Sequence, residues 1–222
     1  MVKKVLLTQS KFRELYSKFI DNFGWTSKID KGIVLENSNL GTSIIYYGIC
    51  NQENKLLYDT IAIKEREGNS VVVIINQNDE IGLLYEYRPI PDKYFYSCVR
   101  GFANEKETGV RTAIREMFEE AGNFDIIKTK SLGQIYQNTT FFEVPINVLL
   151  IEVTYFEKKE TVNNKLKKNQ NEEMIESFHF YNTVEVLNMI RLNKIQCQIT
   201  LSALMLFFSQ ASLAKKEGAG SI

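Results

Sequence analysis

Three glutamates stand within little more than one helical turn of each other. Glu116, Glu119 and Glu120 occupy positions i, i+3 and i+4, a spacing that makes side chains neighbours on one face of an α-helix. Like charges at this spacing destabilise a helix by about a few tenths of a kcal/mol per pair. A hard divalent cation would relieve the repulsion, because Mg²⁺ takes oxygen ligands and keeps waters and substrate phosphates in its shell. The cluster therefore indicates either a solvated acidic face or a metal site.

The residues around this cluster predict the helix that must position it. An apolar stripe recurs at helical spacing over residues 110–121. Its members are Val110, Ala113, Ile114, Met117 and Ala121. Arg115 stands four residues before Glu119, where a guanidinium can pair with the carboxylate. Gly122 follows the stripe directly and is typical of a helix C-terminus.

Composition narrows the chemistry available to the rest of the chain. The 222 residues include 27 Lys plus Arg, 27 Asp plus Glu and a single His, so the formal net charge is zero. One histidine cannot build a three-His zinc site, and a neutral chain gives no general attraction for nucleic acid, which is not expected as a partner. Three cysteines, at positions 50, 98 and 197, lie far apart and are typical of free thiols in a reducing compartment.

No segment predicts export or membrane insertion. The first apolar run ends at Leu7, which is too short for the core of a signal peptide. The longest apolar stretch, near Leu201–Phe208, is well below the ~20 residues that a membrane-spanning helix needs. We therefore expect a cytoplasmic protein with no membrane partner.

Strand and helix patterns alternate irregularly along the chain and favour an α/β or α+β layer sandwich with a mixed sheet. Runs typical of strands lie within 31–66 and at 71–75, 81–87, 94–99, 144–156 and 177–181. Helical patterns lie at 8–20, 110–121, 183–191 and 200–214. Residues 157–173 are polar and aperiodic, which predicts an exposed loop.

The acidic cluster belongs to a longer spacing pattern that resembles the Nudix box. Every position at which that motif has a fixed residue is filled, by Gly101, Glu107, Arg115, Glu116, Glu119, Glu120 and Gly122. Met117 fits an apolar position of the motif. Only the last position departs, because Asn123 stands where the motif has an apolar residue and Phe124 comes one place late.

This resemblance implies a hydrolase of nucleoside diphosphates linked to another moiety, with the Nudix α/β/α sandwich around a mixed β-sheet. The implied ligands of Mg²⁺ or Mn²⁺ are the backbone carbonyl near Gly101 and the carboxylates of Glu116, Glu119 and Glu120. The resemblance also implies that Glu107 and Arg115 orient those carboxylates. The residues expected to act in catalysis are Glu116, Glu120, Arg115 and Glu143.

Similarity to one Nudix branch extends beyond the box. Tyr85-Glu-Tyr-Arg88-Pro resembles the Gln-Tyr-Arg segment of ADP-ribose and ADP-sugar pyrophosphatases. In that branch a small strand-rich N-terminal subdomain dimerises, which implies a homodimer. The implied domains are 1–66 for this subdomain and 67–216 for the Nudix domain, followed by a flexible tail over 217–222.

Two observations leave the substrate open. The branch carries a Ser-Pro-Gly segment after its box, where this chain reads Asn138-Thr139-Thr140; Glu143 follows, as either the water-activating base or an ordinary surface glutamate. Arg88 and Arg100 are candidates for binding substrate phosphate or ribose, and the alternative for each is a surface ion pair. A small-molecule nucleotide is expected as substrate, with ADP-ribose or another nucleotide sugar first. The alternatives are a dinucleoside polyphosphate or an RNA cap, or nucleotide sensing without catalysis.

Overall fold

A computed structural model gives the arrangement of the chain. It describes residues 3–6, 26–28, 34–37, 41–53, 55–154 and 174–218. The helix predicted over 8–20, the loop predicted over 157–173 and residues 219–222 of the predicted tail lie outside these residues. None of the described helices is long and apolar enough to cross a bilayer.

The chain divides into two compact units. The first contains the described residues of Met1–Glu67 together with Tyr136–Pro145, and the second contains those of Gly68–Ile135 and Ile146–Ile222. Tyr136–Pro145 thus belongs with the N-terminal unit, whereas the implied domain boundaries place it within the second domain.

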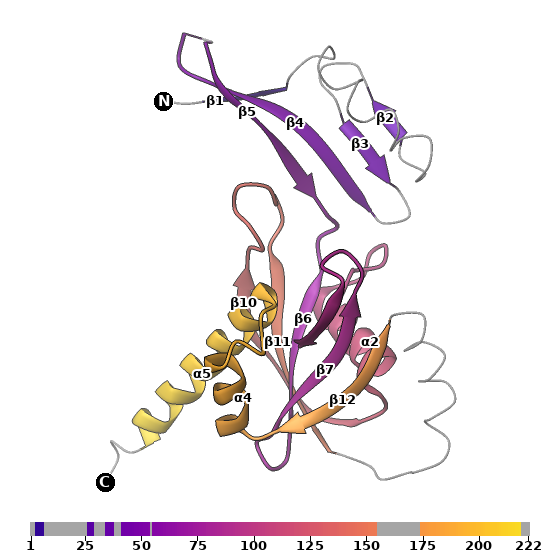
Figure 1. Cartoon of the computed structure of the whole chain (residues 1–222), viewed down its shortest axis with the longest axis vertical. Coiled ribbons are helices and arrows are strands. Elements are labelled where there is room, and N and C mark those ends of the chain that lie inside the picture. Colours follow the sequence, from indigo (N-terminus) through magenta and orange to yellow (C-terminus); the bar gives the residue numbers. More distant parts are fainter. Residues whose placement is uncertain are drawn as a thin grey trace. The chain divides into compact units, whose positions relative to one another are not determined.

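The first unit is built on an antiparallel sheet (Figure 1). Its strands are β1 (Lys3–Leu6), β2 (Thr26–Lys28), β3 (Val34–Asn37), β4 (Thr42–Cys50) and β5 (Leu56–Lys64). The long strand β4 pairs with β1, β3 and β5. The β-branched and aromatic runs over 31–66 therefore form strands as predicted, because such side chains fit a pleated, half-buried surface. The short strands β1 and β2 were not predicted.

The second unit contains a seven-stranded mixed sheet in the order β10-β11-β6-β7-β12, with β8 paired to β7 and β9 paired to β6. The strands are β6 (Ser70–Asn76), β7 (Ile81–Arg88), β8 (Lys93–Ser97), β9 (Val99–Gly101), β10 (Asp125–Ile135), β11 (Ile146–Thr154) and β12 (Ile175–Tyr181). The β11–β6 pair is parallel and the other pairs are antiparallel. The mixed sheet confirms the predicted fold class.

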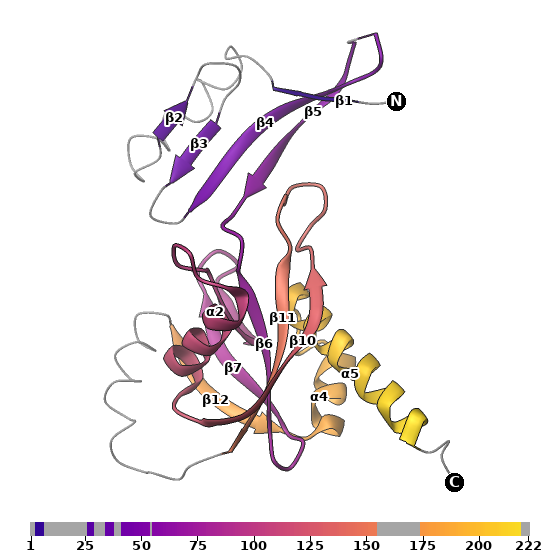
Figure 2. The same cartoon turned by 180° about the vertical axis from the view of Figure 1, so that it is seen from behind.

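Helices cover both faces of this sheet. The helical elements are α2 (Gly109–Glu116), the π-helix η1 (Met117–Ala121), α4 (Thr183–Arg191) and α5 (Gln198–Gly218). Figures 1 and 2 show α2 on one face of the sheet and α4 with α5 on the other. A hydrophobic core lies on each face of the sheet, and strand β6 contributes side chains to both. Val71 and Val73 pack with residues of α4 and α5, whereas Val72 and Ile74 pack with residues of α2. The result is a three-layer α/β/α arrangement in which α2 and the adjoining strand ends position the acidic cluster.

Candidate active site

The helix that carries the glutamates begins regularly and ends in a wider turn. Thr108 caps α2, and its Oγ1 accepts a hydrogen bond from the Arg111 N–H at 3.4 Å. The helix predicted over 110–121 is confirmed, as α2 followed by the π-helix η1, so its second half is wider than the α-helical geometry assumed for the glutamates. The Gly122 N–H bonds the Met117 carbonyl at 3.1 Å, an i→i+5 bond that defines this wider turn. Gly122 ends the helix, as predicted, with a φ of 116°.

The apolar stripe of this helix is mostly as predicted. Ala113 and Met117 are fully buried against the sheet. Val110 was predicted to belong to the stripe, but its side chain is 44% exposed because it lies in the first turn, beyond the packed face. Asn123 is exposed and Phe124 is buried, so Phe124 supplies the packing that the motif assigns one position earlier.

Arg115 is the centre of a hydrogen-bonded network of carboxylates. Its Nη1 donates to Glu116 Oε1 at 2.7 Å and to Glu119 Oε2 at 2.8 Å. Its Nε and Nη2 donate to the two oxygens of Glu107 at 3.1 and 3.0 Å, and Nη2 also donates to the Phe102 carbonyl at 2.9 Å. Burial lowers the pKa of Arg115, but the hydrogen bonds to the three glutamates outweigh this effect and raise it. The guanidinium therefore stays charged and fixes the positions of the carboxylates.

Glu116 and Glu120 are the two buried carboxylates of the cluster. They are 8% and 7% exposed, whereas the side chain of Glu119 is 39% exposed. Glu120 Oε2 accepts the Arg100 backbone N–H at 3.3 Å. Glu116 packs directly on Gly101, where an added Cβ would lie 1.8 Å from Glu116 Cδ. The glycine leaves the space that the Glu116 carboxylate fills.

The donor set fits a divalent cation in type and charge. The Arg115 guanidinium bonds three carboxylates, those of Glu107, Glu116 and Glu119. Glu120, the fourth carboxylate of the cluster, accepts the Arg100 backbone N–H. The four carboxylates outnumber the single guanidinium of Arg115 and leave an excess of negative charge when all are ionised. Oxygen donors are the ligands that Mg²⁺ and Mn²⁺ prefer. In the described part of the chain, no three acidic, histidine or cysteine side chains already converge as a metal site. The ligand role of these residues stays a prediction.

Arg88 and Arg100 meet at one cavity of about 410 Å³. Its other lining residues are Pro89, Ile90, Pro91, Phe95, Ser97 and Cys197. Arg88 Nη2 also donates to Glu86 at 2.6 Å, and Glu86 is 2% exposed. Arg88 therefore forms an ion pair, which was one alternative predicted for it, and also lines a cavity, where the other alternative, substrate binding, stays a prediction. Glu86 was not predicted, although its i, i+2 spacing from Arg88 on a strand was the available signal.

Glu143 belongs to the first compact unit, whereas the box residues belong to the second. Its side chain is exposed and accepts a hydrogen bond from the Tyr47 hydroxyl at 3.4 Å. Its backbone N–H bonds the Ile63 carbonyl at 3.0 Å. The position of Glu143 in the chain is thus anchored on β5, and its catalytic role stays a prediction.

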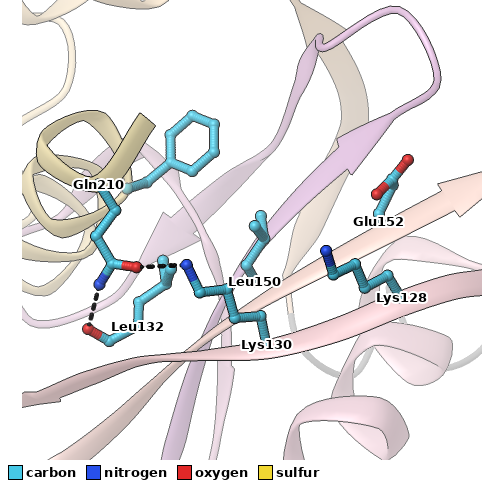
Figure 3. A pocket seen from close by; sticks show the side chains of 7 residues that line it. Lys128, Lys130, Leu132, Leu150, Glu152 and Gln210 are labelled. Atoms are coloured by element: carbon cyan, nitrogen blue, oxygen red, sulfur yellow. Dashed lines mark hydrogen bonds between the residues drawn. The ribbon is translucent and has the colours of Figure 1, made fainter. Parts of the chain in front are cut away.

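A second cavity, of about 180 Å³, lies between β10, β11 and α5. Figure 3 shows Lys130 Nζ bonded to Gln210 Oε1, and Gln210 Nε2 bonded to the Leu132 carbonyl, at 2.8 and 2.9 Å. None of the residues predicted for the site lines this cavity.

The Glu107–Arg115 pair predicts an acid-dependent stability. The hydrogen bonds from Arg115 lower the pKa of Glu107 from 4.5 to about 2. Because the folded pKa is lowered, the pair stabilises the fold above about pH 4.5, and this contribution is lost as the pH falls through about 2. The free energies of unfolding of wild type and Glu107→Gln, measured with urea, should therefore differ most near neutral pH and become equal toward pH 2. Glu105→Gln, at an exposed position of the same loop, is the control. If the difference in unfolding free energy between wild type and Glu107→Gln stays constant over this pH range, the pairing is contradicted.

Comparisons with known proteins identify the family and the fold. A family model of the NUDIX domain matches residues 66–198. One solved structure, described as a crystal structure of an ADP compounds hydrolase, superposes with a TM-score of 0.58 at 16% identity, over 89% of this chain and 97% of that chain. At this identity the likeness shows the fold. No curated protein sequence gives a significant match. The chain belongs to the Nudix family, as a pyrophosphohydrolase of that family.

Proposed function

We propose that this chain hydrolyses the pyrophosphate bond of a nucleoside diphosphate linked to another moiety, with Mg²⁺ or Mn²⁺ as cofactor. ADP-ribose or another nucleotide sugar is the proposed substrate, and the products are a nucleoside monophosphate and a sugar phosphate. The observation that carries this proposal is the carboxylate network of Arg115. Glu120, the remaining carboxylate of the cluster, connects this site to a cavity with two guanidiniums, because it accepts the Arg100 backbone N–H while the Arg100 side chain lines that cavity.

Each residue of the network has a proposed role. The carboxylates of Glu116, Glu119 and Glu120 and the Gly101 carbonyl hold the cation. When bound, a divalent cation neutralises diphosphate charge and lowers the pKa of a bound water. Arg115 keeps Glu116 and Glu119 in place through its hydrogen bonds, and Glu107 fixes Arg115 from the opposite side.

The cavity is proposed to receive the part of the substrate next to the cleaved bond. The guanidiniums of Arg88 and Arg100 present planar sets of N–H donors, which match the geometry of phosphate oxygens. The neighbouring Phe95 and Pro89–Pro91 offer apolar surface to a base or a sugar ring.

Two other functions remain as alternatives to nucleotide-sugar hydrolysis. A dinucleoside polyphosphate or an RNA cap contains the same pyrophosphate bond, but the neutral net charge of the chain does not favour an RNA substrate. A nucleotide-sensing domain without catalysis is disfavoured because every carboxylate of the box is retained. A cytoplasmic location and a homodimer complete the proposal, and light scattering of the full chain tests the dimer.

A substrate panel tests the proposed reaction. The full chain is incubated with Mg²⁺ and, separately, ADP-ribose, other nucleotide sugars, NADH, dinucleoside polyphosphates and capped RNA, and products are resolved by chromatography. We expect turnover of ADP-ribose or another nucleotide sugar to a nucleoside monophosphate and a sugar phosphate. Nucleotide binding without turnover of any compound would establish the sensing alternative instead.

Glu143→Gln tests the proposed base. General-base catalysis contributes about 10²- to 10⁴-fold, so we expect kcat to fall within this range and its dependence on pH at the acidic side to disappear. Glu53→Gln, another exposed glutamate of the first unit, should leave kcat unchanged. An unaltered kcat in Glu143→Gln would remove Glu143 from the mechanism.

A further inference from the structure

The cavity of about 410 Å³ contains hydrogen-bonding groups that have no partner in the protein. Within the described residues, three buried side-chain N or O atoms lack a hydrogen-bond partner, and two of them, Arg88 Nε and Ser97 Oγ, belong to residues that line this cavity. A buried polar atom without a partner costs about 1–3 kcal/mol. The concentration of such atoms at one cavity indicates that a ligand supplies the missing partner.

Ser97 is the more informative of the two. It is 1% exposed and is the last residue of β8, where its Cα pairs with Leu84. The following residue, Cys98, is held by a hydrogen bond from its N–H to Thr200 Oγ1 at 3.1 Å. The backbone therefore holds Ser97 in place at the cavity, and because the residue is buried its hydroxyl has no access to bulk solvent.

The charges at the cavity favour an anion. Among the described residues that line the cavity, Arg88 and Arg100 are the charged ones. Arg88 is paired with the buried Glu86. The guanidinium of Arg100, by contrast, contacts Cys197 Sγ at 4.0 Å and has no carboxylate within 4.0 Å in the described part of the chain. Among the described residues, the Arg100 guanidinium at this cavity thus has no carboxylate partner, and the Ser97 hydroxyl lines the same cavity.

We propose that Ser97 and Arg100 bind a phosphoryl group of the substrate, which makes Ser97 a specificity-determining residue. Guanidiniums are donors only, and the serine hydroxyl can donate as well. A ligand that satisfies all of them must present several acceptor oxygens, and an anionic phosphoryl group offers them together with the negative charge that Arg100 favours. This inference rests on the proposed function, because the Arg100 N–H bonds Glu120 Oε2 and so places this subsite next to the proposed reaction centre.

Cys197 provides a direct test that needs no turnover. It is half-buried and lines the same cavity, whereas Cys98 is fully buried and its pKa is raised by that burial. In a Cys50→Ser background of the full chain, the rate of alkylation by N-ethylmaleimide is followed at both cysteines by mass spectrometry, without metal ions. The probes are inorganic phosphate, ribose 5-phosphate and AMP, with ribose and adenosine as uncharged counterparts.

We expect the phosphorylated probes to slow alkylation of Cys197 at least threefold at saturation, while Cys98 stays unlabelled. Ribose and adenosine should have no effect. Ser97→Ala should raise the probe concentration for half-protection about threefold to tenfold, as the loss of one hydrogen bond predicts, and should raise the substrate KM with little change in kcat. Arg100→Gln should raise that concentration at least tenfold. The controls are Ser131→Ala and Arg191→Gln, at exposed positions outside the cavity.

Failure of the proposed subsite can be distinguished from failure of the proposed hydrolysis. Protection of Cys197 together with an inactive substrate panel would overturn the proposed reaction and retain the subsite. Absence of protection by every phosphorylated probe, equal protection by the uncharged probes, or an unchanged half-protection concentration in Ser97→Ala would overturn the subsite. The melting temperature of each variant is measured alongside, and Arg100→Gln supplies an independent answer if Ser97→Ala fails to fold. Protection by inorganic phosphate alone, without ribose 5-phosphate or AMP, would assign the site to a free anion and overturn the role in substrate recognition.

Discussion

Replacing Glu120 with glutamine is expected to lower kcat about 10²- to 10³-fold while the fold is retained. A metal-bound carboxylate contributes several kcal/mol of charge stabilisation in the transition state, and about 1.4 kcal/mol corresponds to a factor of ten in rate. The amide keeps the shape of the carboxyl and can still accept the Arg100 N–H. Steady-state kinetics with the best substrate of the panel measures the loss, and the Mg²⁺ concentration for half-maximal rate should rise with it.

The matched control for this variant is Glu105→Gln. Glu105 is an exposed carboxylate in the loop between Gly101 and α2, so its replacement changes the net charge equally without touching the proposed ligands. Undiminished turnover in Glu120→Gln would remove Glu120 from the metal site.

Gly101→Ala is expected to lower kcat to a similar degree although no carboxylate is removed. The new Cβ would lie within 1.8–2.2 Å of three side-chain atoms of Glu116, so Glu116 must turn away. Because the atoms in the way belong to the end of a flexible side chain, the backbone can stay in place. We therefore expect a large loss of activity with a small loss of stability, measured by kinetics and by chemical unfolding of the same preparation.

Gly82→Ala is the control in which stability, and not activity, should be lost. Its Cβ would meet the ring of Phe178 at 2.4 Å, and overpacking of a core typically costs about 1–3 kcal/mol. This variant should lose stability while the folded fraction keeps its kcat. If Gly101→Ala instead behaves like Gly82→Ala, the contact between Gly101 and Glu116 has only a structural role.

The sheet of the second unit could be predicted where the sequence is strongly apolar. Val71–Ile75 is β-branched throughout and forms the centre of β6, because a strand covered on both faces needs apolar residues at consecutive positions. Strand β10 was missed for the opposite reason. Over Asp125–Ile135 only Leu132 is buried, and two irregularities in its pairing with β11 interrupt any alternation.

The site shows a similar contrast between local and long-range information. The contact of Arg115 with Glu119 follows from i, i+4 spacing on one helix, whereas the role of Glu107 beside Arg115 was implied only by the resemblance to the Nudix box. The π-helical turn could not be anticipated, because the apolar spacing over 110–121 is that of an ordinary α-helix and gives no sign of the wider turn at Met117–Ala121. Ser97 has no local signal of function, since its importance arises from strands that bring distant residues to one cavity.

The loop between β10 and β11 has a consequence for any attempt to dissect the protein. The chain passes from the first unit to the second, returns for Tyr136–Pro145, and then re-enters the second. In that returning segment, Phe141 and Glu143 are bonded to the backbone of Ile63 in β5. A fragment that begins after residue 66 would therefore lack the strand that holds Glu143, so the N-terminal unit is a structural part of the enzyme and not a removable appendage.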